Sequence, residues 1–459
     1  MIVMKFGGTS VQNESAMCRV MEAVRINAER RPVVVLSAMA GATNGLLQIG
    51  DLAYQGKREE AESIRAQLLE QHLTVARQLL TGSYLARAEE FIAERFVEIS
   101  NIIQGLYLLG ECSPRTKDAL ASFGERLSTF IFAEAFKERG YPAVLLDSRE
   151  LIKTDDNFVQ AAVLQDVSFP LIRERLTPLL DAGQIPVLQG FIGSTVGGIT
   201  TTIGRGGSDY TASLVGAALE SDEIQIWTDV PGILTTDPRI VPKVYKIKLI
   251  SFAEASELAY FGAKVLHPST LLPAVMRNIP VQVCNSRTIH QPGTFISAES
   301  VPSSTPIKSI ACKKGITIIN IHSTRMLLAH GFLRRIFEVF EKHQTVVDVV
   351  STSEVNVSLT IDSTARLDAI LTELRQFADV EVEQDAAVIC VVGDNLRNTP
   401  GVSGRIFNAV KNINVRMISQ GASRINVTFL VGGNRMEEAV RALHEEFFQS
   451  PDPAIFEPC

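Results

Sequence analysis

Cysteine is scarce in this sequence, and its cysteines are not arranged as in a metal site. The chain has 459 residues and six cysteines: Cys18, Cys112, Cys284, Cys312, Cys390 and Cys459. They form no Cys-x-x-Cys pair, and the seven histidines show neither metal-ligand spacing nor an HExxH pattern. We therefore expect reduced thiols and no structural metal.

Long apolar runs and an excess of basic charge are also missing. No window approaches the ~18 uninterrupted apolar residues that a membrane span requires. The N-terminus lacks the basic segment and apolar core of a signal peptide, so we expect a first strand there and a cytoplasmic protein. With 44 Lys and Arg against 51 Asp and Glu, the net charge is −7, which argues against nucleic acid and membranes as partners.

Up to residue 285, short apolar β-branched runs alternate with helical patterns. The candidate strands cover residues 2–6, 32–37, 143–147, 185–189 and 223–228. Long helical patterns lie between them, at 55–109 and 117–139. Strands separated by helices predict parallel crossovers with helices on both faces of the sheet, which is an α/β fold.

The pattern changes at residue 286, and the chain then repeats itself. Residues 286–306 are rich in proline, serine and glycine, as in a domain linker. Beyond them, Gly331–Phe337 matches Gly401–Phe407, and Val355–Val357 matches Ile425–Val427, both at an offset of 70 residues. The constant offset predicts a duplicated unit, each copy having the order of a ferredoxin-like βαββαβ fold.

The segment Lys5-Phe6-Gly7-Gly8-Thr9-Ser10 follows the first apolar run. A strand that ends in a glycine pair exposes backbone N–H groups, and glycine permits left-handed dihedrals and a close approach to a ligand. The lysine adds a point charge for a phosphate. The alternative interpretation is an ordinary connection between a strand and a helix.

A second glycine-rich segment, Gly204-Arg205-Gly206-Gly207-Ser208-Asp209, opens an apolar helix at 211–219. A helix N-terminus binds anions, and an arginine among glycines suits a substrate carboxylate. For Asp209, a plain helix cap is the alternative interpretation.

Two later segments have the same character. Thr228-Asp229-Val230-Pro231-Gly232 is a strand end followed by turn formers, at the edge where a parallel sheet binds ligands. The segment Phe261–Pro268 supplies a second lysine, Lys264, beside a glycine, and we interpret its His267 as structural.

Together these four segments resemble the signature set of aspartate kinases, members of the amino acid kinase superfamily that phosphorylate the β-carboxylate of L-aspartate with ATP. The resemblance spans the whole chain and is strongest to the monofunctional, lysine-sensitive subgroup. It implies a three-layer α/β amino acid kinase domain with a mainly parallel sheet at 1–285 and a linker at 286–310. Two ferredoxin-like ACT domains would follow, at 311–385 and 386–459.

Phosphoryl transfer to a carboxylate needs no general base, because a free aspartate carboxyl titrates near ~3.9. It needs in-line positioning and cations around the moving group. We assign Lys5 to the transferring phosphoryl group and Lys264 to the nucleotide phosphates, with Asp209 orienting Lys5.

The resemblance implies further binding residues. Aspartate would be bound by Thr43, Glu125, Arg205 and Ser208, with Arg205 on the α-carboxylate and Glu125 on the α-ammonium. ATP with Mg²⁺ would be bound by Lys5, Gly7, Gly8, Thr9, Thr228, Asp229, Leu234, Arg239, Lys264 and Val265. Leu234 departs from the family pattern, since relatives often carry tyrosine there near the adenine.

The first repeat carries Asp348 and Glu354 where the second has Ile418 and Arg424. An acidic pair suits a cationic amino acid, and the alternative is two exposed loop carboxylates. The resemblance favours an allosteric L-lysine site, at a homodimer interface of ACT domains, within a dimer or a tetramer. That site would comprise Met326, Phe332, Leu333, Val347, Asp348, Ser353 and Glu354.

Two other functions stay open at this point. One is a different amino acid kinase, acting on glutamate, an N-acetylated amino acid or a nucleotide. The other is an inactive amino-acid sensor in which only the ACT pair works. The effector is also open, because threonine, or lysine with S-adenosylmethionine, regulates some relatives.

Overall fold

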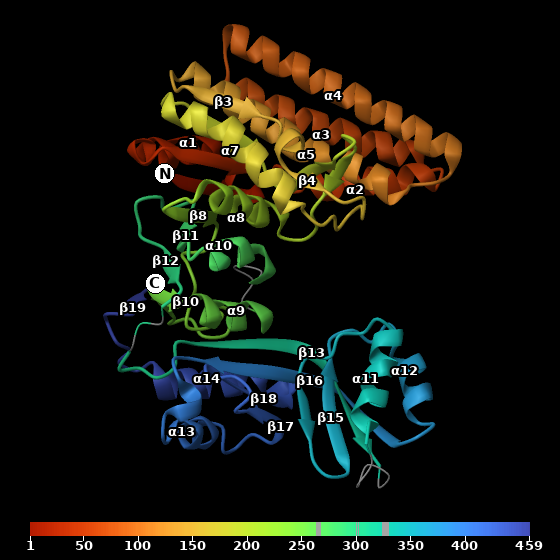
Figure 1. Ribbon diagram of the computed structural model, residues 1–459, viewed down its shortest axis with the longest axis vertical. Helices are drawn as coiled ribbons and strands as arrows, with labels where there is room; N and C mark the ends of the chain where they lie inside the picture. The colour runs from red at the N-terminus through yellow and green to blue at the C-terminus, as the bar shows by residue number, and fades with distance from the viewer. Residues whose placement is uncertain (263–267, 300, 302, 324–329) are drawn as a thin grey trace. The chain divides into compact units, whose positions relative to one another are not determined.

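The computed structural model describes residues 1–262, 268–299, 301, 303–323 and 330–459 (Figure 1). The chain divides into two compact units, residues 1–232 with 266–298, and residues 233–265 with 299–459. These units are defined by spatial contacts, so they do not test the predicted domain boundaries at 285, 310 and 385, which stay predictions. None of the helices in the described residues is both long and apolar enough to cross a membrane.

Seven strands of the first unit lie side by side in a mainly parallel sheet, in the order β12-β11-β8-β1-β2-β5-β3. The pairs β1/β2, β1/β8, β8/β11, β2/β5 and β3/β5 are parallel, and β12 is antiparallel to β11. The strands are β1 Ile2–Phe6, β2 Pro32–Leu36, β3 Ala143–Leu146, β5 Ile185–Gln189, β8 Glu223–Thr228, β11 Val281–Asn285 and β12 Thr294–Ser297. The predicted α/β fold with a mainly parallel sheet is confirmed.

Strands such as β1 and β2 carry apolar side chains on both faces of the sheet and are buried along their whole length. Helices therefore cover both faces. The helices α5 (Pro114–Glu138) and α8 (Gly207–Leu219) both contact central strands of the sheet. The other helices are α1 Glu14–Ile26, α2 Ala42–Tyr54, α3 Arg58–Leu79, α4 Gly82–Leu109, α6 Ser148–Leu151, α7 Gln165–Asp181 and α10 Leu272–Met276.

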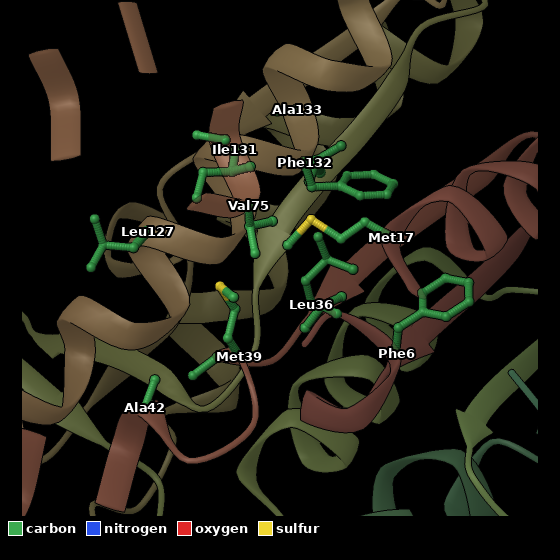
Figure 2. Close-up of a cluster of buried hydrophobic side chains, with 14 of the residues drawn as sticks. Phe6, Met17, Leu36, Met39, Ala42, Val75, Leu127, Ile131, Phe132 and Ala133 are labelled. Carbon is green, nitrogen blue, oxygen red and sulfur yellow. The ribbon is translucent and has the colours of Figure 1, made fainter. Parts of the chain in front are cut away.

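Figure 2 shows the main apolar core of this unit. Phe6 and Leu36 from the sheet meet Met17 of α1, Val75 of α3 and Phe132 of α5. Each of these side chains is at most 4 % exposed. Burial of this kind stabilises the fold by roughly 1.5–3 kcal/mol per large side chain. The core thereby fixes β1, β2 and α5, three of the elements that form the candidate site.

Three short strands lie beside this core: β4 (Lys153–Thr154), β6 (Ile192–Thr195) and β7 (Thr200–Thr202). They form a separate sheet in the order β4-β6-β7. The strand β7 ends two residues before Gly204, so this small sheet leads directly into the second glycine-rich segment.

The second unit is built on one six-stranded sheet in the order β14-β15-β13-β16-β18-β17. All of the pairs in it are antiparallel. The strands are β13 Ser309–His322, β14 Val350–Thr352, β15 Asn356–Ile361, β16 Asp379–Val392, β17 Val415–Gln420 and β18 Asn426–Gly432. The helices are α9 Phe252–Tyr260, α11 Phe332–Lys342, α12 Leu367–Leu374, α13 Val402–Ala409 and α14 Met436–Phe447. Three further strands complete the unit: β9 Tyr245–Ile247, β10 Leu249–Ser251 and β19 Phe456–Pro458.

The duplication is visible in this unit. Helix α11 begins at Phe332 and α13 at Val402, and β15 begins at Asn356 and β18 at Asn426, both pairs at the predicted offset of 70. The first repeat runs β13-α11-β14-β15-α12-β16, as predicted.

The second repeat takes its outer strand from an unexpected place. After α14 the chain forms β19, which pairs with β9 instead of joining the six-stranded sheet. Residues 309–314, the first part of β13, pair with the second part of β16 and occupy the position of a fourth strand. Strands of 14 residues are about 46 Å long, which is enough to serve both repeats.

Candidate active site

A cavity of about 810 Å³ opens where β1, β2, α5 and α8 meet. Its lining includes seven residues that the sequence predicted: Lys5, Gly8, Thr43, Glu125, Arg205, Ser208 and Asp209. The predicted catalytic residues Lys5 and Asp209 and all of the predicted aspartate-binding residues therefore lie around one space.

Lys5 and Asp209 form an ion pair at one side of this cavity. The Lys5 Nζ lies 2.6 Å from Asp209 Oδ1, and both side chains are largely buried. Asp209 lies in the first turn of α8, whose N-cap is Gly206, so the alternative interpretation of Asp209 as the helix cap is wrong. An acidic side chain in that turn interacts favourably with the helix dipole and with the lysine.

The Gly7–Gly8 turn works by close approach and not by unusual dihedrals. Gly7 has a φ of −73° and a ψ of 169°, which any residue adopts, so the expected left-handed conformation is wrong for this turn. A Cβ on Gly8 would lie 2.9 Å from the carbonyl oxygen of Ala38. The left-handed glycines are instead Gly204 (φ +78°) and Gly206 (φ +73°), on either side of Arg205.

Glu125 presents a buried carboxylate to the cavity. It is 3 % exposed, and its Oε1 accepts a hydrogen bond of 3.2 Å from the backbone N–H of Ala38. Its Oε2 is buried and has no hydrogen-bond partner among the described residues. Burial raises the pKa of this carboxyl group to about 8. The site thus holds a carboxyl group whose second oxygen is left for a ligand.

Arg205 supplies the opposite charge. Its side chain is exposed on the turn between Gly204 and Gly206, and within the described part of the chain no carboxylate pairs with it. A free guanidinium in a cavity is suited to a bidentate contact with a ligand carboxylate. Ser208 is held nearby, because its hydroxyl accepts a hydrogen bond of 2.9 Å from the Ser37 hydroxyl.

The residues predicted to bind the nucleotide are divided between the units. Thr228 ends β8 in the first unit, and its carbonyl oxygen accepts a hydrogen bond from the Ser286 hydroxyl. The carboxylate of the next residue, Asp229, lies 3.9 Å from the Arg287 guanidinium. Leu234 and Arg239 belong to the second unit, where Arg239 is 2.6 Å from Asp237. Three predicted residues, Lys264, Val265 and the effector residue Met326, lie outside the described residues.

Sequence reasoning missed several polar residues of the cavity wall. Lys117 and Asp118 lie on α5, and Lys117 Nζ is 3.1 Å from Asp51 Oδ1. The spacing of 117, 118, 121 and 125 places these positions on one face of the helix. The predicted helix at 117–139 and the assignment of Glu125 were enough to infer that these positions share its face.

The predicted effector residues that the structure describes belong to the second unit. Asp348 precedes β14 and Glu354 follows it in the turn to β15, so the two carboxylates lie at opposite ends of this strand. Asp348 lines a small cavity with Tyr260, Lys313 and Asp362, and Glu354 is exposed.

The other predicted effector residues lie on α11 and around β14. Phe332 begins α11 and is buried, whereas Leu333 is 39 % exposed. Val347 is half-buried, and the backbone N–H of Ser353 donates to the Asn356 carbonyl at 2.8 Å.

Known proteins match the chain along its whole length. Residues 1–285 match the amino acid kinase family, and residues 389–447 match an ACT domain. The lysine-sensitive aspartokinase 3 of Escherichia coli is 40 % identical over 98 % of this chain and 99 % of that protein. The chain belongs to the aspartokinase family. Chloroplastic aspartokinase 1 of Arabidopsis thaliana is 38 % identical over 98 % of the chain and 80 % of that protein.

Solved structures agree with this family. Aspartokinase III of E. coli in complex with aspartate and ADP, in the R-state, superimposes with a TM-score of 0.85 at 38 % identity. The same enzyme in complex with lysine and aspartate, in the T-state, gives a TM-score of 0.81. Both alignments cover 98 % of this chain and 100 % of the solved one. The aspartate kinase of Clostridium acetobutylicum, at 27 % identity, gives 0.80 over 97 % of this chain and 100 % of the other.

Proposed function

We propose that the chain is an aspartate kinase, which transfers the γ-phosphoryl group of ATP to the β-carboxylate of L-aspartate and forms 4-phospho-L-aspartate. The observation that carries this proposal is a pair of groups in one cavity, the Oε2 of Glu125 and the guanidinium of Arg205, neither of which has a partner among the described residues. A free α-amino acid has an ammonium for the first group and a carboxylate for the second. The remaining β-carboxylate then shares the cavity with Lys5 and Asp209.

The proposed chemistry requires no general base. The β-carboxylate of free aspartate is ionised at neutral pH, so one of its oxygens attacks the γ-phosphorus directly. The new O–P bond forms as the bond from the γ-phosphorus to the β,γ-bridging oxygen breaks, and ADP leaves with that electron pair. Lys5 places a cation at the moving phosphoryl group, and Asp209 fixes the ammonium of Lys5.

ATP binding is assigned to residues from both ends of the kinase sequence. We assign the phosphates to the close-packed turn at Gly7 and Gly8, to the neighbouring Thr9, and to Lys264 and Val265, which lie outside the described residues. Thr228, Asp229, Leu234 and Arg239 complete the assignment. Mg²⁺ would arrive on the nucleotide phosphates and neutralise part of their charge, because it keeps several waters and needs few protein ligands.

The second unit is assigned to feedback control by L-lysine. A cationic amino acid suits the carboxylates of the first repeat, at Asp348 and Glu354, and the second repeat has no such pair at Ile418 and Arg424. Because these two carboxylates lie at opposite ends of β14, a homodimer of ACT domains fits a lysine site better than one chain does. Inhibition requires that lysine bind the inactive state more tightly than the active state.

Two alternatives fit the cavity less well. An N-acetylated amino acid has no ammonium, so it would leave the Oε2 of Glu125 buried without a partner, which is costly. An inactive sensor would not require the Lys5–Asp209 ion pair, which is intact.

The test is aspartyl hydroxamate formation by the purified chain with ATP and aspartate, titrated with L-lysine, L-threonine and both. Activity that falls with lysine alone supports both assignments. Activity that ignores lysine removes the effector assignment but keeps the kinase. No turnover, together with lysine binding in calorimetry, favours the inactive sensor.

A further inference from the structure

Asp118 is a buried carboxylate that the proposed chemistry does not use. It lies on α5, seven residues before Glu125, so both side chains lie on one face of the helix, and both line the cavity. Asp118 is 1 % exposed. Of the lysines and arginines in the described part of the chain, none forms a salt bridge with it. A buried carboxylate without a cation requires hydrogen bonds.

These hydrogen bonds come from two separate segments. The backbone N–H of Val159 donates to Asp118 Oδ1 and Oδ2 at 3.1 and 3.0 Å. The backbone N–H of Thr202 donates to Oδ2 at 3.0 Å, and the Thr202 hydroxyl donates to Oδ1 at 2.6 Å. Three of these four hydrogen bonds come from backbone N–H groups, which can only donate, and together they require an acceptor at both oxygens.

The first of these segments is held in an unfavourable conformation. Val159 has a φ of +75°, in the left-handed region that a β-branched residue rarely adopts. Its side chain is 40 % exposed and lines the cavity, so burial of the side chain does not account for this conformation. The two hydrogen bonds to Asp118 hold the Val159 backbone in place.

The second segment leads to Arg205. Thr202 ends β7, three residues before Arg205, and its carbonyl accepts a hydrogen bond of 3.0 Å from the Ala161 N–H. A Cβ on Gly204 would lie 3.5 Å from both the Val159 carbonyl oxygen and Gln160 Cγ. The loop at 155–163 therefore packs against the turn that carries Arg205.

We infer that Asp118 is a positioning residue for the amino-acid substrate. It ties the Arg205 turn and the Val159 loop to α5, the helix that carries Glu125, and so fixes the separation of the two groups that clamp the α-carbon. With the α-carbon fixed, the length of the substrate side chain decides whether its carboxylate reaches Lys5. Asp118 thus contributes to the KM for aspartate and to the preference for aspartate over glutamate. The inference rests on the proposed kinase function.

The experiment compares Asp118→Asn with the wild type in steady-state kinetics. The amide replaces one acceptor oxygen by an NH₂ group, which faces the N–H of Val159 in either orientation, so a single oxygen is left for the backbone donors and both segments are held less tightly. The KM for aspartate is expected to rise by about 10–100-fold, and the preference over glutamate to fall, because a small misplacement of a substrate clamp has effects of this size. The kcat and the KM for ATP are expected to stay within about threefold, because the phosphate turn at Gly7–Gly8 follows β1 and does not contact Asp118.

The matched control is Asp155→Asn. Asp155 Oδ1 accepts from the N–H groups of Asn157 and Ala162 in the same loop, at 3.2 and 2.9 Å, and forms no bond to α5. The KM for aspartate is expected to be unchanged in this variant. A rise as large as that of Asp118→Asn would overturn the assignment to the α5 connection.

The other outcomes are also decisive. An unchanged KM for aspartate in folded Asp118→Asn overturns the inference. A fall in kcat together with equal rises in the KM for aspartate and the KM for ATP also overturns it. If this variant does not fold, Thr202→Val decides, because it removes a single donor: a rise of about 3–10-fold in the KM for aspartate supports the inference, and no rise overturns it. A wild type that does not phosphorylate aspartate would instead refute the proposed function, and aspartate binding by calorimetry would then test Asp118 alone.

Discussion

The Tyr260 hydroxyl donates a hydrogen bond of 2.6 Å to Asp348 Oδ1, so the last residue of α9 is tied to the carboxylate assigned to the effector. The same small cavity contains the ion pair between Lys313 and Asp362. The backbone N–H of Asp348 is also fixed, because it donates to the Thr360 carbonyl at 3.0 Å. One oxygen of the Asp348 carboxylate is thus already engaged in a hydrogen bond with Tyr260.

Tyr260→Phe is therefore expected to strengthen lysine binding. A lysine ammonium and the Tyr260 hydroxyl compete for the same carboxylate, and the loss of a hydrogen bond worth about 1 kcal/mol corresponds to roughly a fivefold lower Kd. Calorimetric titration with L-lysine measures this change. Tyr107→Phe, at a similarly exposed tyrosine of α4, is the control. Weaker or unchanged binding in Tyr260→Phe would contradict the competition.

Lys5→Met is expected to lower kcat by about 10²–10³-fold, since a single preorganised charge in a water-excluded site has an effect of this size. Asp209→Asn is expected to lower kcat less, because the lysine stays but loses the partner that fixes it. Initial rates at saturating ATP and aspartate measure both. Lys137→Met, a lysine of α5 that pairs with Glu134 outside the cavity, is expected to keep the wild-type rate. A kcat near the wild-type value in Lys5→Met would remove Lys5 from the chemistry.

Aspartate binding is expected to release a proton below pH 8. The pKa of the Glu125 carboxyl is about 8 in the free protein, so this group is protonated at pH 7 and ionises when the substrate ammonium arrives. Calorimetry at pH 7 in buffers of different ionisation enthalpy measures the released proton. Glu125→Gln is expected to bind aspartate weakly and to show no release. Proton uptake, or no exchange in the wild type, would contradict the pairing of Glu125 with the ammonium.

The same carboxyl group makes stability depend on pH without the substrate. Its pKa is higher in the folded chain than the ordinary value of 4.5, so the folded state binds one proton more than the unfolded state between these values. The free energy of unfolding therefore falls by a few kcal/mol as the pH rises from about 4.5 to about 8. Denaturant unfolding at several pH values checks this, and Glu125→Gln should remove that part of the slope. A wild-type slope equal to that of Glu125→Gln would contradict the assignment.

A buried ion pair holds α9 to the sheet of the second unit. Lys308 Nζ lies 2.9 Å from Glu254 Oε2, and the two side chains are 1 % and 0 % exposed. Lys308→Met leaves a buried carboxylate without its cation and is expected to destabilise the chain by about 3–5 kcal/mol. Thermal unfolding measures this loss. The double variant Lys308→Met with Glu254→Gln is expected to recover part of the stability, and a double variant that is less stable than Lys308→Met would contradict this account.

Much of the fold was predictable from the sequence because it depends on local patterns. Buried parallel strands are continuous apolar runs, and β5 and β8 have the predicted bounds. The predicted strand at 32–37 ends one residue earlier, at Leu36. The offset of 70 residues also placed the helices and strands of the two repeats in register. The shared strands were not predictable, because the pairing of 309–314 with β16 depends on the tertiary fold and not on a local signal.

The candidate site was predictable where its residues lie in recognisable sequence motifs. Lys5, Arg205 and Asp209 lie in glycine-rich segments that predicted a site before the fold was known. Asp118 was missed, because most of its hydrogen bonds come from the backbone N–H groups of Val159 and Thr202, 41 and 84 residues away. Backbone donors carry no signature in the sequence.

The two long strands of the second unit set a limit on how this protein can be divided. The strands at 309–322 and 379–392 each contribute to the sheets of both repeats, so no cut in the chain releases one repeat with a complete sheet. A fragment that ends at residue 385 would lose the strand partner of 309–314 and leave a row of unpaired N–H and C=O groups at a sheet edge. Because both repeats share these two strands, a displacement of either strand moves residues of both repeats.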